Sequence, residues 1–276
     1  MELRFTKMHG LGNDFVVIDG INQSVHLDTH QLRSLADRRH GVGCDQILLV
    51  ETSDRDDSDF RYRIFNADGG EVEQCGNGAR CFARFVREKG LTDADVITVH
   101  TRAGLMELRV EDDEQITVNL GVPILEPADI PFETLVRAPQ YALSVEGETL
   151  EIGCVSLGNP HAVMEIPHID SAHVKQLGPL IESHSRFPNR VNAGFMEVVN
   201  RGHIKLRVYE RGVGETLACG SGACAAVVIG HLWEELDERV EVELRGGNLM
   251  VSWAGENQPV LMTGPATFVF EGTITL

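Results

Sequence analysis

The chain has 276 residues, which is enough for one large domain or two domains of medium size. Its formal net charge of -18 at pH 7 argues against nucleic-acid or membrane-surface partners, because an anionic surface repels phosphate groups. No signal segment opens the chain, and the longest apolar stretch, 223–233, is shorter than the ~20 residues that span a bilayer, so we expect a cytoplasmic protein.

The alternation of apolar and polar residues predicts strands and a few helices in both halves of the chain. In the first half we expect strands at 15–19, 46–50, 62–66, 96–100, 105–110 and 115–120, and a helix at 29–39. In the second half we expect strands at 141–145, 152–157, 162–166, 194–200, 203–209 and 240–244, and a helix at 173–183. Prolines at 123, 127, 131 and 139 mark an irregular stretch. The predicted domains are therefore 1–120 and 121–263, with 264–276 returning to the first domain as a strand.

An internal repeat supports two copies of one domain. Residues 70–79 (GEVEQCGNGA) and 214–223 (GETLACGSGA) are identical at six of ten positions, at an offset of 144 residues. The tripeptide Leu-Gly-Asn recurs at 11–13 and 157–159, at an offset of 146. Two matches in the same order at nearly one offset indicate duplication, and the alternative is a coincidence of glycine-rich turns.

A helix is expected after each copy of the cysteine motif. In the first, Arg80, Arg84 and Arg87 form a stripe with helical spacing, and Gly90 suits the position after the last turn. The second, 223–233, is apolar on nearly every side, so we expect it inside its domain.

The motif Cys-Gly-x-Gly-Ala at a helix start has a specific chemistry. Its glycines leave the first N–H groups bare, and these groups bind an anion such as a carboxylate. A thiol there can have its pKa lowered from about 8.5 to between about 3.5 and 7.5. Two facing copies, at Cys75 and Cys219, would place a sulfur on each face of one α-carbon, where one removes a proton and the other returns one. The alternative is that both cysteines are small buried apolar residues.

The sequence resembles the diaminopimelate epimerases over essentially its whole length. The resemblance rests on seven motifs, which are 8–15 (MHGLGNDF), 41–46 (GVGCDQ), 65–69 (FNADG), 74–80 (QCGNGAR), 158–161 (GNPH), 210–212 (ERG) and 218–222 (ACGSG). It implies an α+β fold of two pseudo-symmetric domains, each a mainly antiparallel, barrel-like sheet around a central helix, with the active site in the cleft between them. It also implies interconversion of LL- and meso-2,6-diaminoheptanedioate in lysine and cell-wall precursor synthesis, and a homodimer for which the strand 267–270 is a candidate interface.

The resemblance also implies roles for individual residues. Cys75 and Cys219 would be the two bases, and the substrate contacts would be Asn13, Gln46, Asn66, Gly76, Asn77, Asn159, Asn192, Glu210, Arg211, Gly220 and Ser221. Arg211 could grip the distal carboxylate with two hydrogen bonds, and Glu210 could pair with an ammonium or tune a thiol. Simpler readings stay open, since the asparagines beside glycine suit turns, Gln46 and Arg211 could face solvent, and His161 could be structural or tune a thiol.

Other functions are less consistent with the sequence. We expect no cofactor, because none of the four lysines lies in a glycine-rich phosphate setting for pyridoxal phosphate and no dinucleotide motif opens a βαβ unit. We expect no metal, because no cysteine pair has the usual zinc spacing. A proline racemase typically carries Asp-Arg-Ser-Pro-Cys-Gly-Thr-Gly, whereas residues 215–222 read ETLACGSG. A non-catalytic thiol redox sensor remains the alternative from another class.

Overall fold

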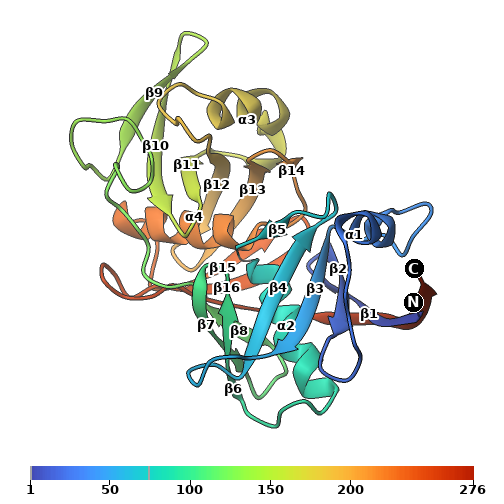
Figure 1. The fold of residues 1–276 in the computed structure, drawn as a ribbon. Coiled ribbons are helices and arrows are strands. Elements are labelled where there is room, and N and C mark those ends of the chain that lie inside the picture. Colours follow the sequence, from blue (N-terminus) through green and yellow to red (C-terminus); the bar gives the residue numbers. More distant parts are fainter. Residues whose placement is uncertain (1, 74) are drawn as a thin grey trace. The chain divides into compact units, whose positions relative to one another are not determined.

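The computed structural model describes residues 2–73 and 75–276, and the chain divides into two compact units. The N-terminal unit comprises the chain up to Asn119 together with Thr263–Leu276, and the C-terminal unit comprises Leu120–Met262. In both units strands predominate, and the described helices are few (Figure 1). The expected mixed, strand-rich fold class is therefore confirmed.

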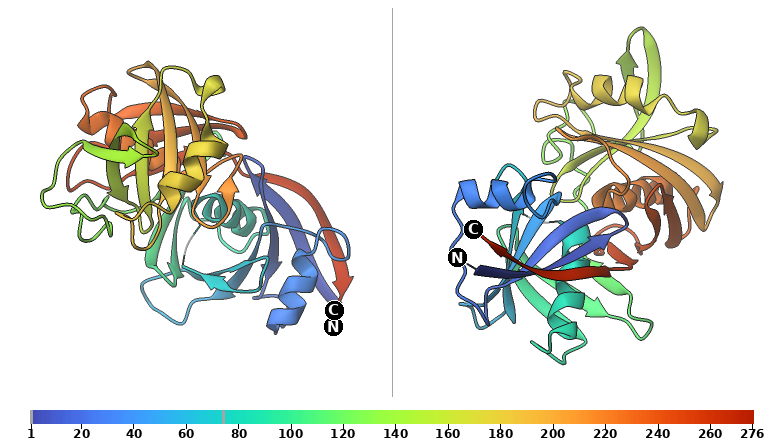
Figure 2. Two further views of the ribbon diagram at one scale, coloured as in Figure 1. Left: turned by 90° about the horizontal axis from the view of Figure 1, so that it is seen from above. Right: turned by 90° about the vertical axis from the view of Figure 1, so that its right-hand side faces the viewer.

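The N-terminal unit is built on a sheet with the strand order β18–β1–β2–β3–β4–β6–β7–β8. These strands are β1 (Glu2–Gly10), β2 (Asn13–Asp19), β3 (Gln46–Thr52), β4 (Phe60–Asn66), β6 (Val96–Thr101), β7 (Gly104–Val110), β8 (Ile116–Asn119) and β18 (Thr267–Thr275), with the short β5 (Glu71–Val72) on the end of β4. All pairs along this order are antiparallel except β2–β3 and β4–β6. The pairing of β1 with β18 brings the two ends of the chain side by side (Figure 2).

The sheet of this unit curves around the helix α2 (Gly76–Glu88). The helix contacts β1, β2 and β3 near one end of the strand order and β7 and β8 at the other. Its inward face is apolar and includes Phe82, Phe85 and Val86, all of them buried. The helix ends where Gly90 takes a φ of 63°, a left-handed conformation that glycine adopts without strain.

The helix α1 (Thr29–Ala36) covers the opposite face of the same sheet. Its buried Leu32 and Leu35 pack against a cluster that includes Val16, Ile18, Ile47, Leu49 and Phe65. Asp28 and Gln31 form a capping box at its start. The helix is shorter than the predicted 29–39, because the chain turns back at Gly41, where a Cβ atom would lie only 2.0 Å from the Ser34 carbonyl oxygen.

The strand β1 was not among the predicted strands. Polar and apolar residues do not alternate regularly along this strand. The polar residues Thr6 and Lys7 are buried, as are the apolar residues Phe5 and Met8. The expectation that a sheet has one polar and one apolar face fails here, since α2 lies on one face of the strand and the α1 layer on the other.

The C-terminal unit repeats the same topology with the order β9–β10–β11–β12–β13–β15–β16. Its strands are β9 (Tyr141–Val145), β10 (Glu148–Ser156), β11 (Pro160–Glu165), β12 (Asn192–Asn200), β13 (His203–Glu210), β14 (Gly214–Glu215), β15 (Arg239–Leu244), β16 (Gly247–Ser252) and β17 (Leu261–Gly264), the last of which crosses from this unit into the other. The parallel pairs β11–β12 and β13–β15 correspond to β2–β3 and β4–β6.

The helices of the C-terminal unit occupy the same places in its topology. The helix α3 (Val174–Glu182) connects β11 to β12, as α1 connects β2 to β3. The helix α4 (Gly220–Leu232) contacts β10, β11, β12, β13 and β16, and it is buried along almost its whole length. A short 3-10 helix, η1 (Ile169–Ser171), precedes α3. None of the helices in the described part of the chain has the length and apolar character needed to cross a membrane.

Candidate functional site

The first cysteine motif begins the central helix of the N-terminal unit. Cys75 occupies the N-cap position of α2, where its sulfur accepts a hydrogen bond from the Gly78 N–H at 3.4 Å. Its Sγ lies 3.8 Å from the Oδ1 atom of Asn13, toward which the thiol donates. The Nδ2 atom of Asn77 donates to the same oxygen at 3.2 Å. The structure therefore brings two other predicted site residues, Asn13 and Asn77, together beside the half-buried Cys75.

Two more predicted residues lie opposite each other on neighbouring strands. Gln46 begins β3 and Asn66 ends β4, and the two are paired in the antiparallel register. The Nε2 atom of Gln46 donates to Asn66 Oδ1 at 2.8 Å. The Oε1 atom of Gln46 is buried and has no hydrogen-bond partner among the described residues. An unsatisfied buried acceptor is costly, so this oxygen is suited to receive a donor such as a substrate ammonium.

The second cysteine motif has a different environment. Cys219 is at the N-cap position of α4, is only 4% exposed, and lies 3.7 Å from the Ser221 hydroxyl. Burial, and then the charge and hydrogen bond of the Glu210 carboxylate, raise the pKa of the Cys219 thiol well above its ordinary value, and the Gly222 N–H and Ser221 oppose them. Cys219 is therefore a thiol at neutral pH.

His161 is buried beside the second motif. Its Nε2 atom lies 3.1 Å from both the Asn159 Oδ1 and the Ser221 Oγ atoms, and Asn159 Nδ2 donates to the same hydroxyl at 3.2 Å. Burial, with the charge of Arg211, lowers the pKa of His161 to about 3. The ring is therefore neutral at pH 7, and its described hydrogen bonds are made with two predicted substrate-binding residues, Asn159 and Ser221.

Asn192, which begins β12, is bonded to Arg211, which directly follows the end of the neighbouring strand β13. Asn192 Nδ2 donates to the Pro160 carbonyl oxygen at 2.9 Å, and its Oδ1 accepts the Arg211 backbone N–H at 2.9 Å. The Arg211 side chain is exposed and donates one hydrogen bond, 3.2 Å long, to the Asn189 carbonyl oxygen. A guanidinium has five N–H donors in a planar fork, so most remain for a carboxylate.

The backbone positions predicted to bind a carboxylate are in the first turns of the two central helices. Gly76 and Asn77 begin α2, and Gly220 and Ser221 begin α4. The first hydrogen bonds to the cysteine carbonyls are made by Ala79 in one helix and Ala223 in the other, so the preceding N–H groups point out of each helix end.

A cluster of four charged residues beside Asn13 was missed at the sequence level. Lys7 and Arg38 bind the Asp14 carboxylate, at 2.6 Å for Lys7 and 2.7 Å for the closer Arg38 contact, and Arg38 also binds Asp45 at 2.6 Å. These bonds hold the pKa of the Asp14 carboxyl well below its usual range. The only signal was that both aspartates occur inside the quoted motifs, next to Asn13 and Gln46. Within 2–73 and 75–276, no three His, Cys, Asp or Glu residues are grouped to hold a metal ion.

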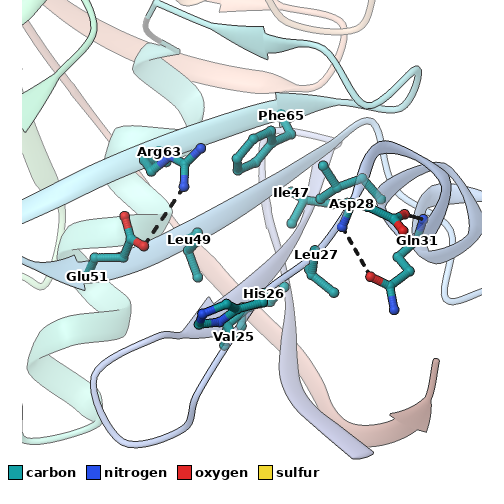
Figure 3. Close-up of a pocket in the computed structure, with 12 residues that line it drawn as sticks. Val25, His26, Leu27, Asp28, Gln31, Ile47, Leu49, Glu51, Arg63 and Phe65 are labelled. Carbon is teal, nitrogen blue, oxygen red and sulfur yellow. Dashed lines mark hydrogen bonds and ion pairs between the residues drawn. The ribbon is translucent and has the colours of Figure 1, made fainter. Parts of the chain in front are cut away.

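A pocket of about 550 Å³ in the N-terminal unit contains none of the predicted site residues. It lies between the segment that precedes α1 and the strands β2, β3 and β4 (Figure 3). Several polar groups on its wall already have partners, since Glu51 lies near Arg63, and Asp28 and Gln31 bond to each other in the helix cap.

Solved structures with this fold include several from other families. A PhzF-family phenazine biosynthesis protein from Bacillus anthracis superposes with a TM-score of 0.71 at 18% identity, covering 100% of both chains. A hydroxyproline epimerase from Agrobacterium vitis gives 0.72 at 14% identity, covering 99% of this chain and 92% of the other. These likenesses show the fold class, a two-domain fold that isomerases share with other proteins.

Sequence comparison then identifies the family. A model of diaminopimelate epimerase matches residues 5–126 and 153–269. Relatives with that name are 63% identical in Thioalkalivibrio sulfidiphilus and 60% identical in Nitrosomonas europaea, each covering 100% of both sequences. The chain belongs to the diaminopimelate epimerase family, and the resemblance inferred from its motifs is confirmed.

Proposed function

We propose that this chain is an isomerase that interconverts LL- and meso-2,6-diaminoheptanedioate by moving a proton between the two faces of one α-carbon. The observation that carries the proposal is the equivalent placement of two cysteines. Each caps a 13-residue helix around which the sheet of its own unit is built. Membership of the family and the names of its close relatives support the choice of substrate.

In the proposed reaction, one sulfur acts as the base and the other as the acid. A thiolate takes the α-proton and becomes a thiol, leaving an electron pair on the α-carbon that the adjacent carboxylate delocalises. The opposite thiol gives its proton to the other face of that carbon and becomes a thiolate. N–H groups of Gly76, Asn77, Gly220 and Ser221 would stabilise the charge on the carboxylate. The high proton affinity of Cys219 makes it the proton donor to the carbanion in one direction.

The distal, unreactive amino-acid end of the substrate requires its own contacts. We propose that Arg211 binds its carboxylate, and that Glu210 with the carboxamides of Asn66, Asn159 and Asn192 completes the remaining polar contacts. Gln46 would accept a hydrogen bond from a substrate ammonium through its buried Oε1 atom. Burying a charged ligand group without such partners is unfavourable, so a monocarboxylic amino acid should be a poor substrate.

The remaining inferences are about assembly and location. We propose a homodimer formed through β18, which pairs with β1 along one edge and exposes Val269 and Phe270. Exposed apolar residues on a strand at a sheet edge favour association with another copy. We also propose a cytoplasmic enzyme that serves lysine and cell-wall precursor synthesis, without a cofactor.

The test of the function is an assay of the purified chain with LL-2,6-diaminoheptanedioate in heavy water, with L-proline as the comparison. The diamino diacid should be epimerised and its product should carry solvent deuterium at the inverted carbon, whereas proline should not react. Racemisation of proline without reaction of the diamino diacid would refute the proposed substrate. Full retention of the original hydrogen in the product would refute the two-base mechanism.

A further inference from the structure

The carboxamide of Asn13 has a fixed orientation next to Cys75. Its Nδ2 atom lies 2.9 Å from the Oδ2 atom of Asp45. A carboxylate only accepts hydrogen bonds, so the nitrogen of the amide must be the atom that faces Asp45. The oxygen consequently faces the opposite side, where it lies 3.8 Å from the Cys75 sulfur.

Asp45 is itself held in place. Arg38 donates to its Oδ1 atom at 2.6 Å, which leaves the Oδ2 atom for Asn13. The backbone N–H of Asp14 donates to Asp45 Oδ2 at 3.2 Å, and the backbone N–H of Asp45 donates to Asp14 Oδ1 at 2.9 Å. Arg38 also donates two hydrogen bonds to Asp14, so the start of β2 and the segment before β3 are joined next to Asn13.

A buried cation orients Asn77, the residue that donates a hydrogen bond to the Asn13 oxygen. Arg80 is fully buried, and it donates to the Pro265 carbonyl oxygen and to Asn77 Oδ1, each at 3.1 Å. A guanidinium cannot accept, so the Asn77 oxygen faces Arg80 and the Asn77 amide nitrogen faces Asn13. Donors and acceptors thus run in one direction from Arg80 through two asparagines to Asp45.

We infer that Asp45 is a positioning residue for Cys75, acting through the orientation of Asn13. An oxygen facing the sulfur accepts a hydrogen bond from the thiol and would repel the thiolate, so this orientation favours the protonated form and makes the thiolate a stronger base. The catalytic consequence rests on the proposed function, whereas the effect on the sulfur does not.

The substitution Asp45→Asn tests the inference. Arg38 can only donate, so the new amide should turn its oxygen toward Arg38 and its nitrogen toward Asn13. Asn13 would then turn over and present its NH2 group to Cys75, which stabilises the thiolate, and it would give up the hydrogen bond that Asn77 Nδ2 now donates to its oxygen. We expect alkylation of Cys75 by iodoacetamide, followed by mass spectrometry in a Cys219→Ser background, to shift to lower pH by about half to one unit, the effect of one hydrogen bond.

Three further variants separate this effect from others. Asp113→Asn is the matched control, because Asp113 also accepts from a backbone N–H and from a side-chain amide. Both donors belong to Gln115 and not to Asn13, so this substitution should leave the profile unchanged. Asp45→Glu keeps a group that only accepts and should restore most of the wild-type profile. In an Asn13→Ala background the shift caused by Asp45→Asn should disappear.

The inference is overturned if Asp45→Asn leaves the alkylation profile unchanged, or if its shift persists without the Asn13 side chain, since a direct effect of charge would then explain it. If Asp45→Asn does not fold, Arg38→Gln replaces it, because the Arg38 side chain is exposed. Arg38→Gln should shift the alkylation profile in the same direction by a smaller amount, and the absence of a shift would overturn the inference.

Catalytic activity is measured in a separate experiment. If the wild-type chain does not epimerise the diamino diacid, the proposed function fails while the alkylation result still stands. In an active enzyme, Asp45→Asn should lower kcat/KM about tenfold and move its acidic limb to lower pH.

Discussion

The two cysteine motifs share their sequence pattern and their place in the fold, yet they differ in what surrounds the sulfur. Cys75 is half-buried among the neutral carboxamides of Asn13 and Asn77. Cys219 is buried beside the carboxylate of Glu210, which raises its pKa. The two motifs therefore share the helix start that positions a sulfur, while the neighbouring residues differ, with a carboxamide beside Cys75 and a carboxylate beside Cys219.

The largest expected effect is loss of either sulfur. Cys75→Ala and Cys219→Ala should each reduce kcat for epimerisation by about 10³-fold or more, because each direction needs one acid and one base. Circular dichroism and thermal unfolding should show an intact fold in both variants. The buried Cys154→Ala serves as the control for removing a thiol away from both helix starts. Substantial activity in either Cys75→Ala or Cys219→Ala would mean that the two cysteines are not the acid and the base of the proposed reaction.

The next effect follows from the carboxylate beside Cys219. Glu210→Gln removes a negative charge that raises the pKa of this thiol, so Cys219 should lose its proton at lower pH. The alkaline limb of kcat/KM should therefore move to lower pH, and the rate at neutral pH should fall by about 10²-fold, the scale of one acid–base contribution.

The control for Glu210 is Glu256→Gln, which changes an exposed glutamate of the same unit. It should leave both limbs of the profile in place. An unchanged alkaline limb in Glu210→Gln would show that Glu210 does not set the pKa of the Cys219 thiol.

Much of this comparison could be predicted from the sequence, because the features concerned are local. The repeat located both cysteines, and the glycines after them predicted that each begins a helix, as Cys75 and Cys219 do. The strand β9 was predicted at its observed bounds, Tyr141–Val145, because its alternation is regular.

What could not be predicted depends on contacts between residues distant in the chain. The bond between Asn13 and Asp45 joins residues 32 apart, and that of Arg80 with Pro265 joins residues 185 apart. A stripe of arginines on a helix normally suggests a solvent-exposed face, whereas Arg80 is fully buried because carbonyl and amide oxygens are available to it. No periodicity in the sequence carries that information.

A smaller effect is expected at the proposed distal anchor of the substrate. Arg211→Lys keeps the charge but loses the planar fork, so it should cost about 1.5–3 kcal/mol of transition-state binding, or roughly 10- to 150-fold in kcat/KM. Arg201→Lys, at an exposed arginine of the same unit, is the control. If Arg211→Lys retains full catalytic efficiency with the diamino diacid, another residue holds the distal carboxylate.

The smallest expected effect is on stability, and it concerns the neutral, buried His161. In the unfolded chain a histidine has a pKa of about 6.5, whereas burial lowers the pKa of His161 in the folded protein to about 3. Between these values the unfolded state holds more protons, so the free energy of unfolding falls as the pH falls, by about 2–3 kcal/mol from pH 7 to pH 4.5 for this group. His161→Gln, which can still donate toward Asn159, should remove that loss of stability between pH 7 and pH 4.5, even if it lowers stability at pH 7.

The measurement is urea unfolding of the wild type and of His161→Gln at pH 7 and at pH 4.5. His26→Gln, at an exposed histidine, is the control. Because the other titrating groups contribute equally in all variants, only the difference between variants reports on His161. An identical fall in stability for wild type and His161→Gln would show that the ring takes up its proton without cost in the folded state.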